Sequence, residues 1–428
     1  MDNFFEPPLI GACIFGQSGG PTAVINASAY GVIRTALDSD VITNVYGAAY
    51  GIKGVLNDEL YDMAEEEDYE LKLLLNTPSS ELGSCRYKIA DPEVDDTDYI
   101  RILEIFKKYD IRYFFYNGGN DSMDTCNKIS RYMEKVGYEC RVMGVPKTID
   151  NDLFGTDHCP GYGSAAKFIA TSCMEVGKDT DVYNTDMVTV IEIMGRHAGW
   201  LTASAALATE YGNGCGPDLI YLPERDFDLD QFTEDVTKIM KQKRNVLVAV
   251  SEGLHYADGS FVSEAKTSGT DGFGHAQLGG LAVKLANYLK ERMGLKKVRG
   301  IELSLLQRSA AHIASAVDID EAYSVGKYAV EAAINGATGQ MVALEREDNQ
   351  GLYSCKPTLL SLSSVANYEK KVPLEWITRD GNYVTNEFIN YVLPLIQGEP
   401  RIPQSNSLPR YARLKKVKAK PCEKEAAE

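Results

Sequence analysis

The sequence predicts an α/β protein made of two doubly wound, Rossmann-like lobes with mostly parallel sheets. Two observations carry this prediction. Short apolar runs typical of strands alternate with helical patterns along most of the chain, and several of these runs end directly in glycine-rich or charged turns. The length of 428 residues allows two or three domains. In such sheets ligands bind beyond the carboxyl ends of the strands, so we expect the site in the cleft between the lobes.

The first half of the chain contains two strand–glycine turn–helix units. The predicted strands are Leu9–Phe15, Val41–Tyr50 and Ile111–Tyr116, and the predicted helices run from Ala23 to Leu37, from Tyr99 to Tyr109 and up to Val136. Gly19-Gly20 follows the first strand and Gly118-Gly119 the third. Glycines let backbone N–H groups approach an anion at the helix N-terminus, so each unit can cradle a phosphate. The acidic run from Asp58 to Glu70 is expected to be a solvated helix face or loop.

The segment after the predicted strand Val142–Val145 contains several charged and polar side chains close together. The apolar run Val142–Val145 should end at Pro146, which cannot donate a ladder hydrogen bond. Lys147-Thr148-Ile149-Asp150-Asn151-Asp152 then supplies one cation, one hydroxyl and two carboxylates. At a strand end these groups can bind phosphate, hold a metal or remove a proton, whereas the alternative interpretation is a solvated turn.

The second half repeats the strand–helix alternation. Predicted strands are Met187–Ile193, Leu219–Leu222, Val246–Val250 and Gln340–Leu344, and predicted helices cover Gly163–Lys178, Gln277–Met293 and Asp318–Gly336. Met194-Gly195-Arg196 and Glu252 follow two of these strands, and Arg299 and Arg308 lie further on. Beyond Pro357 the pattern loosens, and the tail from Arg410 is expected to be disordered at its end.

Composition narrows the class of protein. The net charge of -17 argues against general binding of nucleic acid or anionic membranes. Nine scattered cysteines with no C-x-x-C pair indicate neither a disulfide scaffold nor a zinc site, and they favour a reducing compartment. With no apolar run near ~20 residues and no signal-peptide pattern at the N-terminus, we expect a cytoplasmic protein.

The candidate groups match phosphoryl transfer, which needs positioning, charge neutralisation, a metal and one base. They are the two glycine turns, the cations Arg86, Lys147, Arg196, Arg299 and Arg308, and the carboxylates Asp121, Asp150, Asp152 and Glu252. The missing G-x-G-x-x-G disfavours a dinucleotide-binding dehydrogenase.

The order of these motifs resembles the phosphofructokinase family, and its pyrophosphate-dependent branch more than its ATP-dependent one. The resemblance spans Leu9 to Leu344 and rests on Ser18-Gly19-Gly20, Gly83-Ser84 with Arg86, Gly118-Gly119, Thr148–Asp152, Met194–Arg196, Glu252 and Gln307-Arg308. It implies a reversible transfer of phosphate from pyrophosphate to the 1-hydroxyl of fructose 6-phosphate in glycolysis or gluconeogenesis. It also implies a homodimer or homotetramer, because some family sites are built across subunits.

The resemblance assigns roles residue by residue. Asp150 is the implied general base, with Lys147 and Asp121 as further catalytic groups. The implied fructose 6-phosphate site comprises Thr148, Ile149, Asp150, Met194, Gly195, Arg196, Glu252, Arg299, Gln307 and Arg308. The implied donor site comprises Gly19, Gly20, Arg86, Gly119, Asp121, Ser122 and Lys147. Mg²⁺ is the implied cofactor, with Asn120 as a weak ligand where most relatives have Asp, and Asp152 as a further candidate.

Two positions decide the donor. ATP-using relatives carry Gly where this chain has Asp121 and Lys147. A carboxylate at 121 would repel a nucleotide's α-phosphate, while Lys147 adds a cation for pyrophosphate. Two departures concern the bacterial ATP-dependent enzymes, which have Arg where this chain has Met187 and Tyr30, although Arg34 is kept. The first removes a sugar-phosphate contact, and the second predicts loss of control by nucleotide diphosphates.

The implied domain division is a donor-binding lobe at 1–160, to which part of 307–356 returns, and a sugar-phosphate-binding lobe at 161–306. Residues 357–428 form a C-terminal extension. Two alternatives stay open: a kinase that uses ATP or another acceptor such as sedoheptulose 7-phosphate, and a non-catalytic regulatory subunit that binds sugar phosphate. The intact Asp150 argues against the second.

Overall fold

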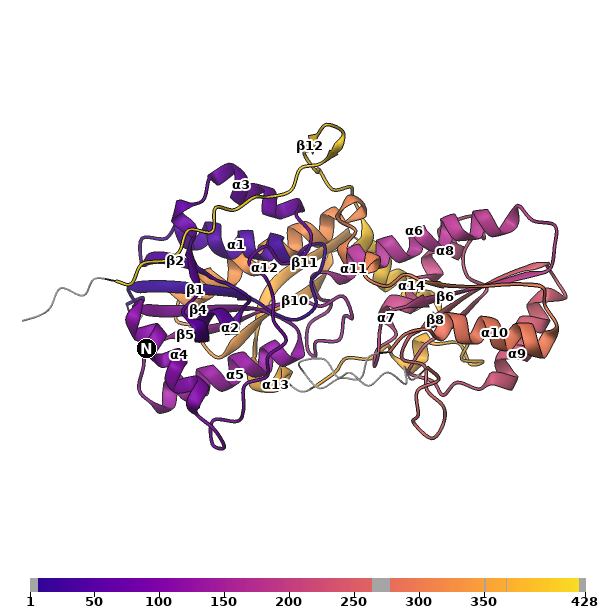
Figure 1. Ribbon diagram of the computed structural model, residues 1–428, viewed down its shortest axis with the longest axis horizontal. Helices are drawn as coiled ribbons and strands as arrows, with labels where there is room; N and C mark the ends of the chain where they lie inside the picture. Colours follow the sequence, from indigo (N-terminus) through magenta and orange to yellow (C-terminus); the bar gives the residue numbers. More distant parts are fainter. Residues whose placement is uncertain (1–6, 264–277, 350–351, 367, 423–428) are drawn as a thin grey trace, which may run out of the picture.

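Two lobes, each built on its own sheet, lie side by side along the long axis of the molecule (Figure 1). The computed structural model describes residues 7–263, 278–349, 352–366 and 368–422. None of the helices in these ranges is both long and apolar enough to cross a membrane. The two sheets are mostly parallel and flanked by helices, which confirms the predicted architecture.

The large sheet has seven strands in the order β11-β10-β5-β4-β1-β2-β3. Their bounds are β1 (Gly11–Gln17), β2 (Ile42–Ala48), β3 (Leu60–Asp62), β4 (Ile111–Gly118), β5 (Arg141–Pro146), β10 (Gln340–Asn349) and β11 (Leu352–Ser361). Only the edge strands β3 and β11 run antiparallel to their neighbours. Neither edge strand was predicted from the sequence. β11 includes Pro357, which an edge tolerates because one side of the strand needs no partner.

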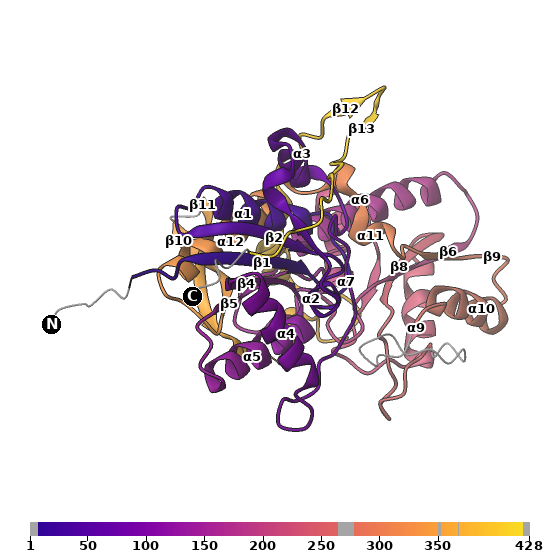
Figure 2. The same ribbon diagram turned by 60° about the vertical axis from the view of Figure 1, so that its left-hand side comes forward.

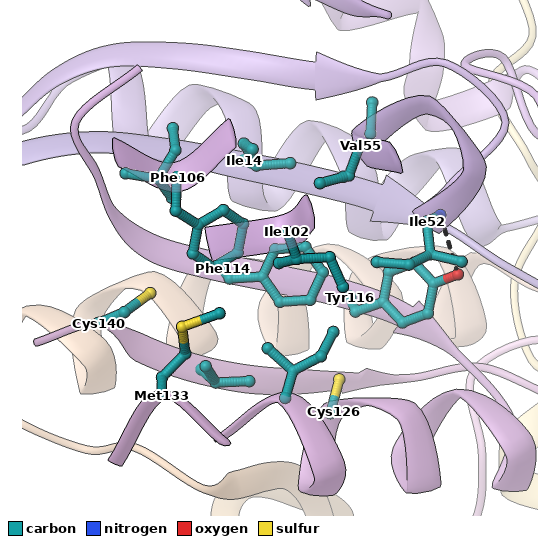
Figure 3. Packing of buried hydrophobic residues seen from close by; sticks show 14 of the residues in the cluster. Ile14, Ile52, Val55, Ile102, Phe106, Phe114, Tyr116, Cys126, Met133 and Cys140 are labelled. Carbon is teal, nitrogen blue, oxygen red and sulfur yellow. Dashed lines mark hydrogen bonds between the residues drawn. The ribbon is translucent and has the colours of Figure 1, made fainter. Parts of the chain in front are cut away.

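Helices cover both faces of the large sheet. They are α1 (Ile25–Leu37) and α12 (Ala316–Ile334) on one face, and α4 (Thr97–Lys108) and α5 (Asn120–Lys135) on the other, with the shorter α2 (Ile52–Asn57), α3 (Asp68–Leu73) and α13 (Leu362–Val365) around them. Successive side chains of a strand point to opposite faces. Phe114 accordingly packs with Ile102 and Phe106 of α4 (Figure 3), whereas Phe115 packs towards α1 and α12.

The small sheet is fully parallel, in the order β7-β8-β6-β9. Its strands are β6 (Met187–Ile193), β7 (Leu219–Tyr221), β8 (Asn245–Ser251) and β9 (Lys297–Glu302). The surrounding helices are α6 (Tyr162–Asp181), α7 (Trp200–Ala203), α8 (Ala206–Tyr211), α9 (Leu229–Met240), α10 (Leu281–Met293) and α11 (Leu306–Ser309). Apolar residues fill both faces, as expected for buried parallel strands.

The C-terminal segment visits both lobes. α14 (Asn386–Val392) packs into the core of the small lobe through Phe388 and Val392. The chain then forms the β12 (Gln404–Ser405) and β13 (Leu408–Pro409) hairpin, which projects from the molecule in both views (Figure 1 and Figure 2). Residues 410–422 run along the large lobe, where the backbone of Lys418 forms an isolated antiparallel β-bridge with that of Tyr61 in β3. The end of the tail, residues 423–428, lies outside the described residues.

The prediction that the acidic run is solvated was wrong for part of it. Leu60–Asp62 forms β3, and Glu66 is buried. The carboxylate of Glu66 accepts backbone hydrogen bonds from Lys415 and Lys416 at 2.7 Å each. Sequence reasoning missed this contact because its two sides lie some 350 residues apart.

Candidate active site

The glycine turn after β1 lies among three cations. A Cβ atom placed on Gly20 would lie 3.1 Å from Arg308 Nη1 and 3.7 Å from Arg86 Nη2. On Gly19, which has a φ of +76°, it would lie 3.3 Å from Lys147 Nζ. Any side chain here would therefore fill the space between the cations, and the left-handed φ of Gly19 disfavours other residues. The turn and the three cations form a cradle suited to an anion.

Lys147 enters this cradle from the end of β5. Its side chain is buried, and Nζ donates to the carbonyl oxygen of Gly20 at 2.6 Å. Burial, reinforced by the like charges of Arg86 and Arg308 and opposed by Asp150, lowers the pKa of Lys147 to about 7. An anion bound beside Nζ would favour the charged ammonium again. Binding of an anion and protonation of Lys147 therefore favour each other.

Asp150 lies on the loop after Lys147, facing the same cations. Its backbone N–H donates to Thr148 Oγ1 at 3.1 Å, which shapes the turn. Burial first, and then the charges of Asp152 and Glu252, raise the pKa of Asp150, while Lys147 and Arg196 oppose the rise. A carboxylate whose pKa is raised towards neutrality can act as a general base at physiological pH.

The turn after β6 is held by side chains from two other segments. The N–H of Met194 donates to Gln307 Oε1 at 3.1 Å, and that of Gly195 donates to Glu252 Oε1 at 3.4 Å. Gly195 has a φ of +129°, and a Cβ there would lie 2.6 Å from the carbonyl oxygen of Ala198. The small lobe thereby presents Arg196 and Glu252 towards Asp150, whose pKa both influence.

Arg308 connects the two lobes. It lies in α11, yet its guanidinium reaches Gly20 of the large lobe. Burial and the like charge of Arg86 lower the pKa of Arg308, and Asp150 and Glu252 oppose this. Its Nε is buried with no hydrogen-bond partner among the described residues. A buried donor of this kind fits a site that binds an anion.

Asn120 begins α5 directly after the second glycine turn. Its Nδ2 donates to Asp152 Oδ2 at 3.2 Å, which leaves Oδ1 as the free acceptor. Within the described part of the chain, Oδ1 is buried without a partner. An amide oxygen on a side chain that contacts the Asp152 carboxylate is part of a donor set that a hard cation such as Mg²⁺ accepts. The residues present therefore fit the cofactor expected from the sequence.

Asp121 and Ser122 occupy the first turn of α5. Lys88 Nζ lies 4.0 Å from Asp121 Oδ1, so a cation that sequence reasoning missed lies near the donor side of the site. The signal for it was its position two residues after Arg86, in a segment that forms neither helix nor strand. Ser122 is buried against Gly118, where a Cβ would lie 2.0 Å from its Oγ. Gly119 lies close to Lys147 and Thr148.

Two of the predicted sugar-phosphate residues lie differently from the rest. Ile149 packs into the core of the small lobe, which leaves its backbone as the part that can face a ligand. Arg299 lies on the edge strand β9, where it is exposed, and its Nη1 is 3.3 Å from Asp179 Oδ2. A single chain therefore does not bring Arg299 to the cluster around Asp150.

Known proteins resemble this chain over most of its length. The phosphofructokinase family model matches residues 12–361, which is most of the chain. The chain belongs to the phosphofructokinase family. It is 45% identical over 405 residues to a pyrophosphate–fructose 6-phosphate 1-phosphotransferase of Halomonas elongata, covering 94% of this chain and 96% of that one. The corresponding protein of Methylococcus capsulatus is 44% identical and covers 94% of this chain and 95% of its own.

A solved structure of a related protein resembles this chain over nearly its whole length. The crystal structure of a pyrophosphate-dependent phosphofructokinase from Nitrosospira multiformis superimposes with a TM-score of 0.86 at 41% identity. The match covers 95% of this chain and 97% of that one. It therefore extends past residue 361, where the family model ends, into the C-terminal extension.

Met187 and Tyr30, the two positions predicted to depart from the ATP-dependent enzymes, lie in different lobes. Met187 is fully buried at the start of β6 and offers no charge. The ring of Tyr30 lies against that of Tyr323 in a tilted arrangement, with ring centroids 5.7 Å apart. Arg34 forms ion pairs with Asp38 at 2.5 Å and Asp68 at 2.9 Å. Two carboxylates of the chain itself thus pair with the guanidinium of Arg34.

Proposed function

We propose that this protein is a pyrophosphate:fructose 6-phosphate 1-phosphotransferase that forms fructose 1,6-bisphosphate and phosphate reversibly. The observation that carries the proposal is the placement of Lys147. Its buried ammonium contacts the Gly20 carbonyl, beside the base candidate Asp150, where a compact inorganic donor would lie. The names of the relatives at 44–45% identity support the same donor and acceptor.

Asp150 acts as the general base in the proposed reaction. Its carboxylate takes the proton of the sugar 1-hydroxyl as that oxygen attacks the terminal phosphorus of pyrophosphate. The new P–O bond forms as the bond to the bridging oxygen breaks, and inorganic phosphate leaves. Lys147 and Arg308 face the transferring group and stabilise its charge. Asn120 and Asp152 would hold Mg²⁺, which supplies further charge neutralisation when bound.

The remaining residues orient the two substrates. Proposed contacts to fructose 6-phosphate come from Thr148, Ile149, Met194, Gly195, Arg196, Glu252, Arg299, Gln307 and Arg308. Proposed contacts to pyrophosphate come from Gly19, Gly20, Arg86, Gly119, Asp121, Ser122 and Lys147. All nine cysteines are free thiols, and we therefore place the enzyme in the reducing cytoplasm.

A donor assay tests the proposal. Purified protein with fructose 6-phosphate and Mg²⁺ should turn over with pyrophosphate and not with ATP. The double variant Asp121→Gly, Lys147→Gly should lose most pyrophosphate activity, because it removes a buried cation and opens the space of a nucleotide α-phosphate. Lys147→Arg is the matched control that keeps the charge. Turnover of the wild type with ATP alone, or full pyrophosphate activity in the double variant, would contradict the donor assignment.

A further inference from the structure

Asn151, between the two carboxylates of the catalytic loop, has an unusual backbone. Its φ is +54°, and its side chain is fully buried. A non-glycine residue in this region is strained and persists only where its surroundings hold it. Asn151 Oδ1 accepts the N–H of Cys159 at 2.9 Å, and Nδ2 donates to Tyr391 Oη at 2.8 Å. These two hydrogen bonds fix the conformation from which Asp150 projects.

Tyr391 is itself held firmly. It lies in α14, beyond the residues that match the family model. Its hydroxyl donates to the carbonyl oxygen of Asp157 at 2.7 Å. The same hydroxyl accepts from Asn151, so Tyr391 holds the loop at both Asn151 and Asp157. Arg346 lies over its ring at 4.9 Å and donates to its carbonyl oxygen at 3.0 Å. The ring of Trp200 lies 5.2 Å away, centroid to centroid.

A second segment of the extension holds the same loop. The N–H of Lys370 donates to the carbonyl oxygen of Asp152 at 2.8 Å, and its Nζ donates to that of Asp157 at 2.6 Å. The carbonyl of Lys370 in turn accepts Trp200 Nε1 at 2.9 Å. Trp200 begins α7, shortly after the Met194–Arg196 turn. The extension thus touches the catalytic loop and the segment following the sugar-phosphate turn.

We propose that the C-terminal extension positions the catalytic base, with Tyr391 acting through Asn151 on Asp150. Tyr391 is a positioning residue, because it acts on Asp150 through its hydrogen bond with Asn151. The inference rests on the proposed function and assigns a role to a segment beyond the family model. Displacement of a reacting group by about 1 Å can cost ~100-fold in rate, so loss of one hydroxyl is expected to be measurable in turnover.

The test compares Tyr391→Phe with Tyr221→Phe. The control also deletes one buried hydroxyl, which donates to Asp235 Oδ2 at 2.8 Å in the small lobe. Both variants should lose similar thermal stability. Only Tyr391→Phe should lower kcat, by about tenfold or more, while KM for both substrates stays within about twofold. The acid limb of its pH–rate profile should also move, because Asp150 changes its distance to Lys147 and Asp152.

Asn151→Gly and Asn151→Ala give a second test should Tyr391→Phe fail to fold. Glycine accepts the left-handed φ and alanine does not, so the glycine variant should retain more kcat. Equal kcat in Tyr391→Phe, Tyr221→Phe and wild type would overturn the inference alone. A wild type inactive with pyrophosphate and fructose 6-phosphate would overturn the proposed function, and this inference with it.

Discussion

Asp150 and Lys147 lie three residues apart, and each affects the charge of the other. Burial raises the pKa of the carboxyl and lowers that of the ammonium, while their mutual attraction opposes both shifts. The nearby Arg86 and Arg308 favour the neutral amine, and Asp152 and Glu252 favour the neutral acid. The pKa values of both groups therefore lie near neutral pH, where a small change in their surroundings can protonate or deprotonate either group.

Replacement of the base gives the most direct residue-scale prediction. Asp150→Asn should lower kcat by about 10²- to 10⁴-fold with little change in KM, because it removes proton transfer and keeps the shape. In the wild type the raised pKa means that kcat/KM falls as pH drops towards the acid side of neutrality, rather than near pH ~4. The pyrophosphate-dependent rate of the wild type and of Asp150→Asn, measured from pH 4 to 9, tests the loss of kcat and the pH dependence. An acid limb near pH ~4 would contradict the assignment.

His158 makes stability depend on pH at a residue outside the reaction. Its ring lies between Asp157 Oδ1 at 2.8 Å and Glu321 Oε2 at 2.7 Å. Burial disfavours the imidazolium, yet Glu321 and Asp157 outweigh it and raise the pKa of His158 to about 8. Because the folded value exceeds the unfolded one, the stabilisation is complete below pH ~6.5 and is lost as pH rises through 8.

Between these limits the free energy of unfolding should fall by about 2 kcal/mol. Urea unfolding at pH 6 and pH 9 measures this difference, and His158→Gln should abolish the part that His158 contributes. If wild type and His158→Gln lost the same free energy over that range, the imidazolium would not be the source.

At the scale of elements, the tail anchors on the acidic run through Glu66. Glu66→Ala should lower the free energy of unfolding by ~1–3 kcal/mol, because two backbone N–H groups of the tail lose their acceptor. Glu67→Ala is the neighbouring control. Its carboxylate is mostly exposed, 3.4 Å from Lys415 Nζ, and should matter by less than ~1 kcal/mol. Chemical denaturation measures the free energy of unfolding of both variants. Equal losses of free energy would show that the buried Glu66 carboxylate stabilises the fold no more than the exposed Glu67 does.

At the scale of the whole molecule, the proposed role of Arg299 in binding fructose 6-phosphate requires a second chain, because Arg299 is exposed on the edge strand β9. We expect a homodimer or homotetramer in which the exposed β9 edge brings Arg299 to a neighbouring subunit's sugar phosphate. Arg299→Ala should then raise KM for fructose 6-phosphate roughly tenfold with kcat little changed, as loss of one charged contact implies. Light scattering gives the assembly state. A fully active monomer would exclude this role for Arg299.

The sequence by itself determined the repeating strand–helix order and the residues that follow each strand. Apolar runs and glycine turns are local signals, and parallel strands place their carboxyl ends along one edge. That rule brings Gly20 and Lys147 to one edge of the large sheet, and Arg196 and Glu252 to one edge of the small sheet. The sequence also indicated the family, because its motifs occur in the order typical of that family.

Only the tertiary structure decided what holds the site and how it is charged. Arg308 reaches Gly20 from the other lobe, Tyr391 reaches Asn151 across 240 residues, and Glu66 meets the tail across about 350. No local pattern encodes such contacts, since each depends on how remote segments pack. The same packing removes water from Lys147 and Asp150, and it is this desolvation, a property of the folded surroundings, that moves their pKa values.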